Sequence, residues 1–388
     1  MQNNTILSRG VEEIIDKNHL QKQLRSDKKL RVKLGIDPTS PNLHIGRAVV
    51  LWKLRAFQEL GHKAILIVGD FTGLIGDTSD KDAERPVISE AEVKKNMKRY
   101  FDQAFKILDP KKTETHHNSK WLKNLGLVEL AKMASLFGLH EFESREVIAR
   151  RMKVGKRVSF HELLYPLMQG YDSVAVKADL ELGGTDQRFN LLTGRRIQSL
   201  YGQPPQDILM TKLLEGTDGR KMSSSWGNVI NITDSPDEMF GKVMSIGDGL
   251  INKYFELATN LPAAQIGKFL SSTPSPRDQK MFLAERIVWQ YHDQKTALSA
   301  RKNFESKFGS RETGKIRADF QLKKKPGSYR LVDLLVEGRL ASSKSEARRK
   351  IKEGAVEVDG SRITDERVLV KINKKTLIRL GKRFLGIK

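Results

Sequence analysis

Roughly the first 225 residues of the chain alternate short apolar runs with segments of helical period. The runs 31–36 and 64–68 are rich in Val, Ile and Leu, whereas 48–60 and 91–108 repeat apolar residues every three or four positions. The first pattern is typical of buried strands and the second of helices. Their alternation predicts an α/β fold with a Rossmann-like parallel sheet. Ligands of such sheets bind beyond the carboxyl ends of the strands.

One of these strand ends carries a candidate phosphate site. The run 31–36 is followed by Asp37, a turn at 38–42, and Leu43-His44-Ile45-Gly46, where a helix should begin. A helix N-terminus offers unpaired N–H groups and partial positive charge to an anion. His44 can donate a hydrogen bond to phosphate oxygens, and Gly46 leaves room for a base or ribose. An ordinary helix start is the alternative, since Pro, Ser and Asn are common there.

A second candidate element lies far along the chain, at Lys221-Met222-Ser223-Ser224-Ser225. It follows the turn-forming run 216–220, so we expect a loop with a cation and three hydroxyls at its tip. Such a loop could close over pyrophosphate. Two phosphate-handling elements in one chain indicate an ATP-dependent enzyme.

The chain is too long for one ordinary core, because 388 residues correspond to two or three domains. Residues after the second element read mainly as helices, including 236–244, 254–259 and a long segment at 278–308. We expect a catalytic domain at 1–228, a helical domain at 229–320, an exposed basic linker at 321–328 and a small α+β domain at 329–388.

The C-terminal part is strongly basic. Residues 301–388 carry 25 Lys and Arg against 11 Asp and Glu, out of a formal net charge of +22 for the whole chain. The order helix at 331–335, basic helix at 343–352 and hairpin at 355–360 resembles the small RNA-binding fold first named from a ribosomal small-subunit protein. Such concentrated charge favours a polyanionic partner. A generic helix–hairpin module with a solvated basic face is the alternative.

The residue composition bears on the compartment and the cofactors that we expect for the chain. The absence of cysteine excludes disulfides and thiolate chemistry, which suits the cytoplasm. The first ten residues are polar, and the apolar stretch 64–75 is interrupted by Gly69, Asp70 and Gly73, so we expect neither secretion nor membrane insertion. We also expect no protein-ligated metal, because His116-His117 and His161-Glu162 lack the spacing of a zinc motif.

Together the two elements resemble the HIGH and KMSKS motifs of class I aminoacyl-tRNA synthetases. The intervening sequence is similar to that of the bacterial-type tyrosyl-tRNA synthetases, and the resemblance covers nearly the whole chain. It implies ATP-dependent ligation of L-tyrosine to tRNA(Tyr) through a tyrosyl-adenylate, with release of pyrophosphate and AMP. It also implies ATP with Mg²⁺ as the substrate complex, no tightly bound cofactor, and a homodimer. Such chemistry needs donors and cations rather than a protein nucleophile.

The resemblance assigns residues to three roles. The catalytic donors and cations are His44, Lys221, Arg47, Lys81 and Arg85. The ATP-binding residues are Gly35, Asp37, Thr39, His44, Gly46, Gly184, Asp186, Lys221, Met222, Ser223 and Ser224. The tyrosine-binding residues are Asp77, Tyr165, Gln169, Asp172 and Gln187. In this assignment Asp172 accepts a hydrogen bond from the substrate phenol. Lys81 and Arg85 could equally be solvated surface charges.

Three positions depart from the family pattern. Arg47 replaces the last His of HIGH, Ser224 replaces the second Lys of KMSKS, and Lys33 lies where many relatives have a tyrosine against the phenol. We hypothesise that Arg47 partly compensates for the missing loop lysine. The alternatives are a tryptophanyl-tRNA synthetase and a catalytically silent RNA-binding paralogue, which adenylate formation with different amino acids would separate.

Overall fold

The computed structural model describes residues 3–77, 89–308, 318–372, 376–381 and 383–387. The chain forms two compact units, Met1–Asp293 and Gln294–Lys388, and each is described by itself. Among the described residues, none of the helices combines the length and the apolar character that crossing a bilayer requires. The sequence-based boundaries of a separate helical domain remain a prediction.

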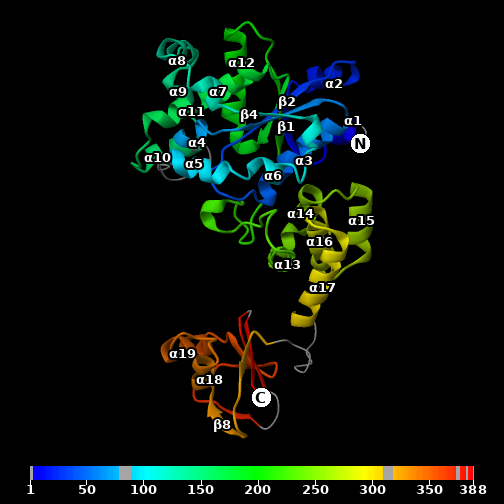
Figure 1. Cartoon of the computed structure of the whole chain (residues 1–388), viewed down its shortest axis with the longest axis vertical. Helices are drawn as coiled ribbons and strands as arrows, with labels where there is room; N and C mark the ends of the chain where they lie inside the picture. The colour runs from blue at the N-terminus through cyan, green and yellow to red at the C-terminus, as the bar shows by residue number, and fades with distance from the viewer. Residues whose placement is uncertain (1–2, 78–88, 309–317, 373–375, 382, 388) are drawn as a thin grey trace. The chain divides into compact units, whose positions relative to one another are not determined.

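The first unit is built on a six-stranded sheet, which confirms the predicted α/β fold (Figure 1). The strands are β1 (Val11–Ile15), β2 (Arg31–Ile36), β3 (Lys63–Val68), β4 (Thr113–His117), β5 (Leu180–Gly184) and β6 (Asp207–Thr211). Their order is β1-β6-β5-β2-β3-β4, with β1 antiparallel to β6 and the other pairs parallel. All side chains of β5 and β6 are buried, as expected for a sheet covered on both faces.

The order of the strands fixes where a ligand can bind. The chain runs from β2 outward to β3 and β4, then returns to place β5 on the other side of β2. Connections therefore leave β2 and β5 in opposite directions, which opens a crevice at their carboxyl ends. Helix α3 (Ile45–Glu59) packs on β2, β3 and β5, and α11 (Phe160–Val176) packs on α12 (Arg188–Leu200).

The other α-helices of the first unit surround this frame. They are α1 (Asn3–Ile6), α2 (Lys17–Arg25), α4 (Thr72–Ile75), α5 (Glu90–Met97), α6 (Tyr100–Ala104), α7 (Ser119–Leu122), α8 (Leu127–Ala134), α9 (Leu139–Glu143) and α10 (Glu146–Lys153), followed by α13 (Pro236–Met244), α14 (Ile251–Ala258), α15 (Ala263–Ser272) and α16 (Pro276–Tyr291). Arg9 ties the N-terminal segment to the end of α14, because its guanidinium donates to the carbonyl oxygens of residues 255, 256, 259 and 261.

The expected long helix at 278–308 is divided in two. Helix α16 ends at Tyr291 and α17 (Gln294–Phe308) begins three residues later. His292 between them has φ −122° and ψ −117°, and its Nε2 lies 3.1 Å from the carbonyl oxygen of Asp234. The expectation of a continuous helix was therefore wrong, because the backbone is non-helical at His292.

The second unit contains the predicted helix, basic helix and hairpin. They are α18 (Leu331–Glu337), α19 (Lys344–Lys352) and the strands β9 (Val356–Val358) and β10 (Ser361–Ile363), joined by Asp359 and Gly360 at positive φ. The other strands are β7 (Phe320–Leu322), β8 (Gly327–Arg330), β11 (Leu369–Ile372), β12 (Thr376–Leu380) and β13 (Arg383–Ile387). The stretch 321–328, which we expected to be an exposed linker, thus contributes residues to β7 and β8.

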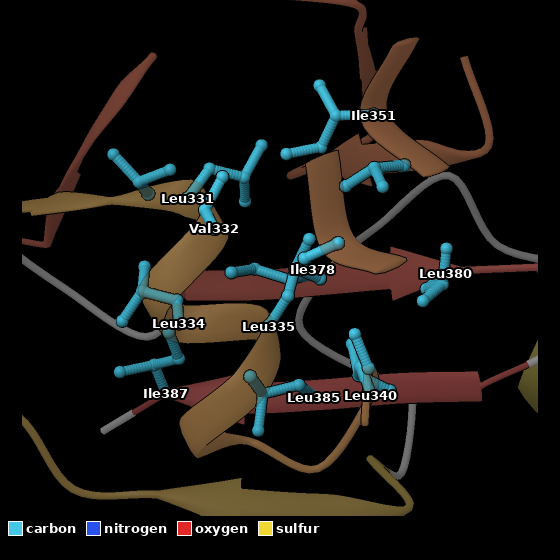
Figure 2. Close-up of a cluster of buried hydrophobic side chains, with 14 of the residues drawn as sticks. Leu331, Val332, Leu334, Leu335, Leu340, Ile351, Ile378, Leu380, Leu385 and Ile387 are labelled. Atoms are coloured by element: carbon cyan, nitrogen blue, oxygen red, sulfur yellow. The ribbon is translucent and has the colours of Figure 1, made fainter. Parts of the chain in front are cut away.

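Leucine and isoleucine side chains form the core of this unit. Figure 2 shows Leu331, Leu334 and Leu335 of α18 together with Ile378 and other side chains of β12 and β13. Helix α19 buries only Ala347 and Ile351. Its basic side chains are therefore left at the surface of the unit.

Candidate active site

A cavity of about 490 Å³ lies at the carboxyl ends of β2 and β5, where the strand order predicts a ligand. Every sequence-predicted site residue within the described part of the chain lines it: Gly35, Asp37, Thr39, His44, Gly46, Arg47, Asp77, Tyr165, Gln169, Asp172, Gly184, Asp186, Gln187, Lys221, Met222, Ser223 and Ser224. Lys81 and Arg85 lie outside the described residues. The roles assigned to all of these residues remain predictions.

The segment around His44 is held at the entrance of α3. His44 is the N-cap residue, with φ −95° and ψ 160°, and its Nδ1 accepts from the backbone N–H of Arg47. The flanking residues pair with a distant strand-like segment: the N–H of Ile45 donates to the oxygen of Ile230 at 2.8 Å, and that of Ile232 to the oxygen of Leu43 at 2.9 Å. This pairing buries His44 and fixes its backbone.

The two elements predicted to handle phosphate meet across the cavity. A Cβ placed on Gly46 would lie 3.4 Å from the Cβ of Met222, so the helix start and the loop are in van der Waals range. Ser224 Oγ donates to Ser40 Oγ at 3.2 Å. Lys221 Nζ lies 2.7 Å from Asp186 Oδ2, at the end of β5. The loop therefore contacts both strand ends.

Arg47 holds the turn that follows β2. Its Nη1 donates to the carbonyl oxygen of Asp37 at 2.9 Å and to the hydroxyl of Tyr100 at 3.2 Å, and its Nη2 donates to Thr39 Oγ1 at 3.1 Å. Tyr100 in turn donates to the oxygen of Ser40. Whether Arg47 also compensates for the serine at position 224 remains a prediction.

Asp37 connects three elements of the cavity wall. Its carboxylate accepts from Tyr165 Oη at 2.8 Å and from Thr72 Oγ1 at 2.7 Å. Burial, together with the charge of Asp37, holds the pKa of Tyr165 well above its usual range, so the phenol stays protonated and remains a donor. On the same wall, Gln187 Nε2 donates to Asp77 Oδ2 at 2.6 Å.

Asp172 is one of the buried carboxylates that line this cavity, at 3% exposure. Trp121 Nε1 donates to its Oδ1 at 2.7 Å, and Asn118 Nδ2 donates to its Oδ2 at 3.2 Å. Burial raises the pKa of Asp172 to about 7, although these donors and the charge of Lys33 lower it. In the ionised form Asp172 is a fixed acceptor, and it suits a ligand that brings a hydroxyl donor.

Sequence reasoning missed Asn118 and Trp121. Asn118 follows β4 directly, so its place at the carboxyl end of a strand could have marked it as a candidate. Lys33 occupies the position where many relatives have a tyrosine against the phenol. In the structure its side chain points behind the cavity wall. Its Nζ lies 2.9 Å from the oxygen of Gln169, 2.8 Å from Ser173 Oγ and 2.9 Å from Glu181 Oε1.

Away from the cavity, Asp16, His19 and Asp207 bring ligand-type atoms within 4.8 Å of one another. His19 Nδ1 lies 2.9 and 3.0 Å from the two oxygens of Asp207, in the geometry of a hydrogen-bonded pair. The absence of a protein-ligated metal remains a prediction.

Comparison with known proteins defines the class. A family model described as tRNA synthetases class I (W and Y) matches residues 25–309, and one for the SYY-like C-terminal domain of tyrosine–tRNA ligase matches residues 318–385. The tyrosine–tRNA ligase of Thermotoga maritima is 45% identical over 383 residues, covering 97% of this chain and 95% of its own. That of Carboxydothermus hydrogenoformans is 46% identical, covering 98% and 96%. The chain therefore belongs to the tyrosine–tRNA ligase family of class I tRNA synthetases.

Solved structures confirm the fold. The tyrosyl-tRNA synthetase of Archaeoglobus fulgidus, determined with L-tyrosine, is 23% identical with a TM-score of 0.60, covering 76% of this chain and 98% of its own. The C-terminally truncated mitochondrial enzyme of Coccidioides posadasii is 21% identical with a TM-score of 0.63, covering 77% and 90%. Both support the Rossmann-like fold predicted from the sequence.

Gly69 provides a test of the Asp37 arrangement. A Cβ at this position would lie 2.0 Å from Asp37 Oδ1 and 2.3 Å from Thr72 Oγ1. We expect Gly69→Ala to displace both side chains and lower the free energy of unfolding by about 2 kcal/mol, as overpacking does. Urea denaturation followed by circular dichroism measures the change.

The matched control is Gly241→Ala in α13, where a Cβ meets nothing within 4 Å. That variant should be as stable as the wild type or more stable, since alanine favours a helix by about 1 kcal/mol over glycine. Equal stability of the Gly69→Ala variant and the wild type would contradict the crowding at Asp37.

Proposed function

We propose that the chain ligates L-tyrosine to tRNA(Tyr) in two steps. The tyrosine carboxylate attacks the α-phosphorus of ATP, forming tyrosyl-adenylate as the bond to pyrophosphate breaks. A terminal ribose hydroxyl of tRNA then attacks the tyrosyl carbonyl carbon, and AMP leaves. The observation that carries the proposal is the cavity itself, in which the buried acceptor Asp172 shares one space with the two phosphate-handling elements. The tyrosine–tRNA ligases of Thermotoga maritima and Carboxydothermus hydrogenoformans, which are 45% and 46% identical over nearly the full chain, support it.

The amino acid would lie between Asp172 and the residues near Tyr165. The ionised Asp172 accepts the phenol O–H, which a phenylalanine side chain cannot supply. Gln169, Asp77 and the Tyr165 hydroxyl are the polar groups available to the ammonium group, and Gln187 contacts the aminoacyl part. The carboxylate of the bound tyrosine must point at ATP. With the phenol at Asp172, this carboxylate would face the start of α3 at His44.

ATP would bind along the carboxyl ends of β2 and β5. The helix N-terminus at His44 and the ammonium group of Lys221 stabilise charge on the phosphates, which is the main task of an enzyme that uses no nucleophile of its own. Asp186 accepts from ribose hydroxyls, and Gly46 admits the nucleoside. Mg²⁺ arrives on the ATP phosphates, since it prefers phosphate oxygens and water to an all-protein site. Lys81 and Arg85 stay as proposed helpers.

The basic C-terminal unit would bind the tRNA backbone. Arg348, Arg349 and Lys352 of α19 line one depression of its surface together with Ser345, Glu353 and Glu366. Neutralising phosphates with such side chains releases counterions, so binding should weaken steeply with salt. In this proposal the helical domain at 229–320 and the domain at 329–388 hold the anticodon and long arm. Charging of tRNA takes place in the cytoplasm, where we place the enzyme.

We also propose a homodimer formed through the segment before and at the start of α11. Large apolar side chains are exposed there within a short stretch of chain, and exposed apolar clusters mark contact surfaces. They are Leu127 at 81%, Val128 at 68%, Leu139 at 59%, Met152 at 48%, Val154 at 63% and Phe160 at 72% exposure.

The first prediction from the proposed function concerns substrate choice. Purified protein should exchange labelled pyrophosphate into ATP with tyrosine and not with phenylalanine or tryptophan. Phenylalanine has no donor for Asp172, and tryptophan carries an indole N–H in place of the phenol hydroxyl. Lys221→Ala should reduce the exchange rate by about 100-fold, as loss of one charge-stabilising group does. Exchange with tryptophan alone would identify a tryptophanyl-tRNA synthetase, and folded protein without exchange would identify a silent RNA-binding paralogue.

The second prediction concerns pH. Because the pKa of Asp172 is raised to about 7, the carboxylate is ionised above that pH and becomes protonated as the pH falls through it. The kcat/KM for tyrosine should therefore fall on the acid side of pH 7. Asp172→Asn should abolish this acid limb and reduce tyrosine-over-phenylalanine selectivity by on the order of 100-fold, the value of a hydrogen bond to a charged group.

A pH profile of exchange between pH 6 and 9, recorded with tyrosine and with phenylalanine for wild type and Asp172→Asn, measures both effects. An Asp172→Asn enzyme that kept the wild-type acid limb and full selectivity would refute the assignment of the subsite.

The third prediction concerns assembly. Leu127→Glu combined with Phe160→Glu should convert a dimer into monomers, since two charges in an apolar interface are not compensated. Light scattering coupled to gel filtration measures the mass. Leu298→Glu, at an apolar position of 43% exposure on α17, is the control and should stay dimeric. A wild-type monomer at micromolar concentration contradicts the proposal.

A further inference from the structure

Lys33 lies in the middle of β2 and is entirely buried, at 0% exposure. Its ammonium group has three protons and three acceptors: the oxygen of Gln169 at 2.9 Å, Ser173 Oγ at 2.8 Å and Glu181 Oε1 at 2.9 Å. Gln169 and Ser173 belong to α11, and Glu181 to β5. One side chain therefore joins two strands and the helix that carries the tyrosine subsite.

Glu181 is equally buried and accepts from more than Lys33. Gln169 Nε2 donates to its Oε1 at 3.2 Å, Ser173 Oγ donates to its Oε2 at 3.1 Å, and Gln206 Nε2 donates to Oε2 as well. Glu181 and Gln169 both line the cavity. The carboxylate thus fixes the amide of Gln169 on the wall where the amino acid would bind.

Stability alone does not account for this pair. The attraction within a buried ion pair often offsets little more than the free energy lost when both groups leave water. A protein with apolar residues of similar size in place of the pair is often as stable. Lys33 lies behind the wall at the amino-acid end of the cavity and Glu181 forms part of that wall, and the charges of both act on Asp172. The charges of the pair therefore act on the subsite.

Charged and titratable groups approach Asp172 from each element packed around it. Lys33 comes from β2, Glu181 from β5 and Tyr165 from the same helix, while Asn118 and Trp121 contribute neutral donors. Lys33 lowers the pKa of Asp172 and Glu181 raises it. The two members of the ion pair thus act on the acceptor in opposite directions.

We propose that Lys33 and Glu181 are positioning residues of the tyrosine subsite: the pair fixes Gln169 at the cavity wall and balances charge beside Asp172, so that Asp172 accepts the substrate hydroxyl at neutral pH. The inference rests on the proposed function, since it takes L-tyrosine as the ligand. It assigns Lys33 a task behind the wall, where direct contact with the phenol is not needed.

The test is calorimetric binding of L-tyrosine to the full-length protein between pH 6 and 9. Lys33→Met should weaken binding at pH 7 about tenfold or more and move the midpoint of the pH dependence upward by about one unit, as loss of a nearby opposite charge does. Glu181→Gln should move the midpoint downward. In the double variant Lys33→Met/Glu181→Gln the midpoint should return toward the wild-type value.

The matched control is Lys28→Met, which removes an ion pair with Asp179 that is half exposed on its lysine side. Tyrosine affinity and the pH midpoint should be unchanged there. If Lys33→Met does not fold, Glu181→Gln and the double variant still give the direction and the reversal of the shift.

Three results would overturn the inference: unchanged midpoints in the folded variants, shifts in the same direction for Lys33→Met and Glu181→Gln, or a wild type that binds no tyrosine. A merely structural pair would lower stability without shifting the midpoints in opposite directions. Tyrosine binding without ATP–pyrophosphate exchange in the wild type would instead refute the proposed function. The shifts of the binding midpoint in the variants would still test whether Lys33 and Glu181 position the subsite.

Discussion

The active-site cavity depends on the backbone pairing between residues 43–45 and 230–232. The first segment enters α3 from the end of β2, and the second follows the loop that carries Lys221. Two short hydrogen bonds thus join parts of the chain that local structure would leave independent. Because the pairing also buries His44, the helix start is fixed before any ligand is present. Such a preformed arrangement reduces the cost of orienting two substrates.

Around this frame the cavity wall is built from polar side chains that satisfy one another. Asp37 accepts from Tyr165 and Thr72, Asp77 accepts from Gln187, and Asp172 accepts from Trp121 and Asn118. Buried carboxylates are costly unless they are hydrogen-bonded, so each acidic residue has its donors nearby. These contacts also hold the carboxylates of Asp37, Asp77 and Asp172 in place along the cavity that they line.

Much of the fold could be predicted from local pattern, and much of the site from motifs. The apolar pattern and the capping residues mark β2, the turn after it and the start of α3 clearly in the sequence. The basic helix and the hairpin near the C-terminus are likewise visible in the local sequence. The contacts that shape the site were not predictable. Asn118 and Trp121 reach Asp172 across 54 and 51 residues, and Lys33 finds Glu181 on a different strand. The break at His292 was also missed, because no Gly or Pro marks it and its ring contacts the distant Asp234.

The ion pair between Lys221 and Asp186 has a consequence for the order of events at the site. The carboxylate that holds the loop cation is the same group that would accept the ribose hydroxyls of a nucleotide. In the proposed mode of ATP binding, the sugar and the ammonium group would compete for this one acceptor, and binding of the sugar would release the cation next to the phosphates. The charge of Lys221 would then stay on Asp186 until a nucleotide binds, so the charge distribution of the site would respond to the presence of the substrate.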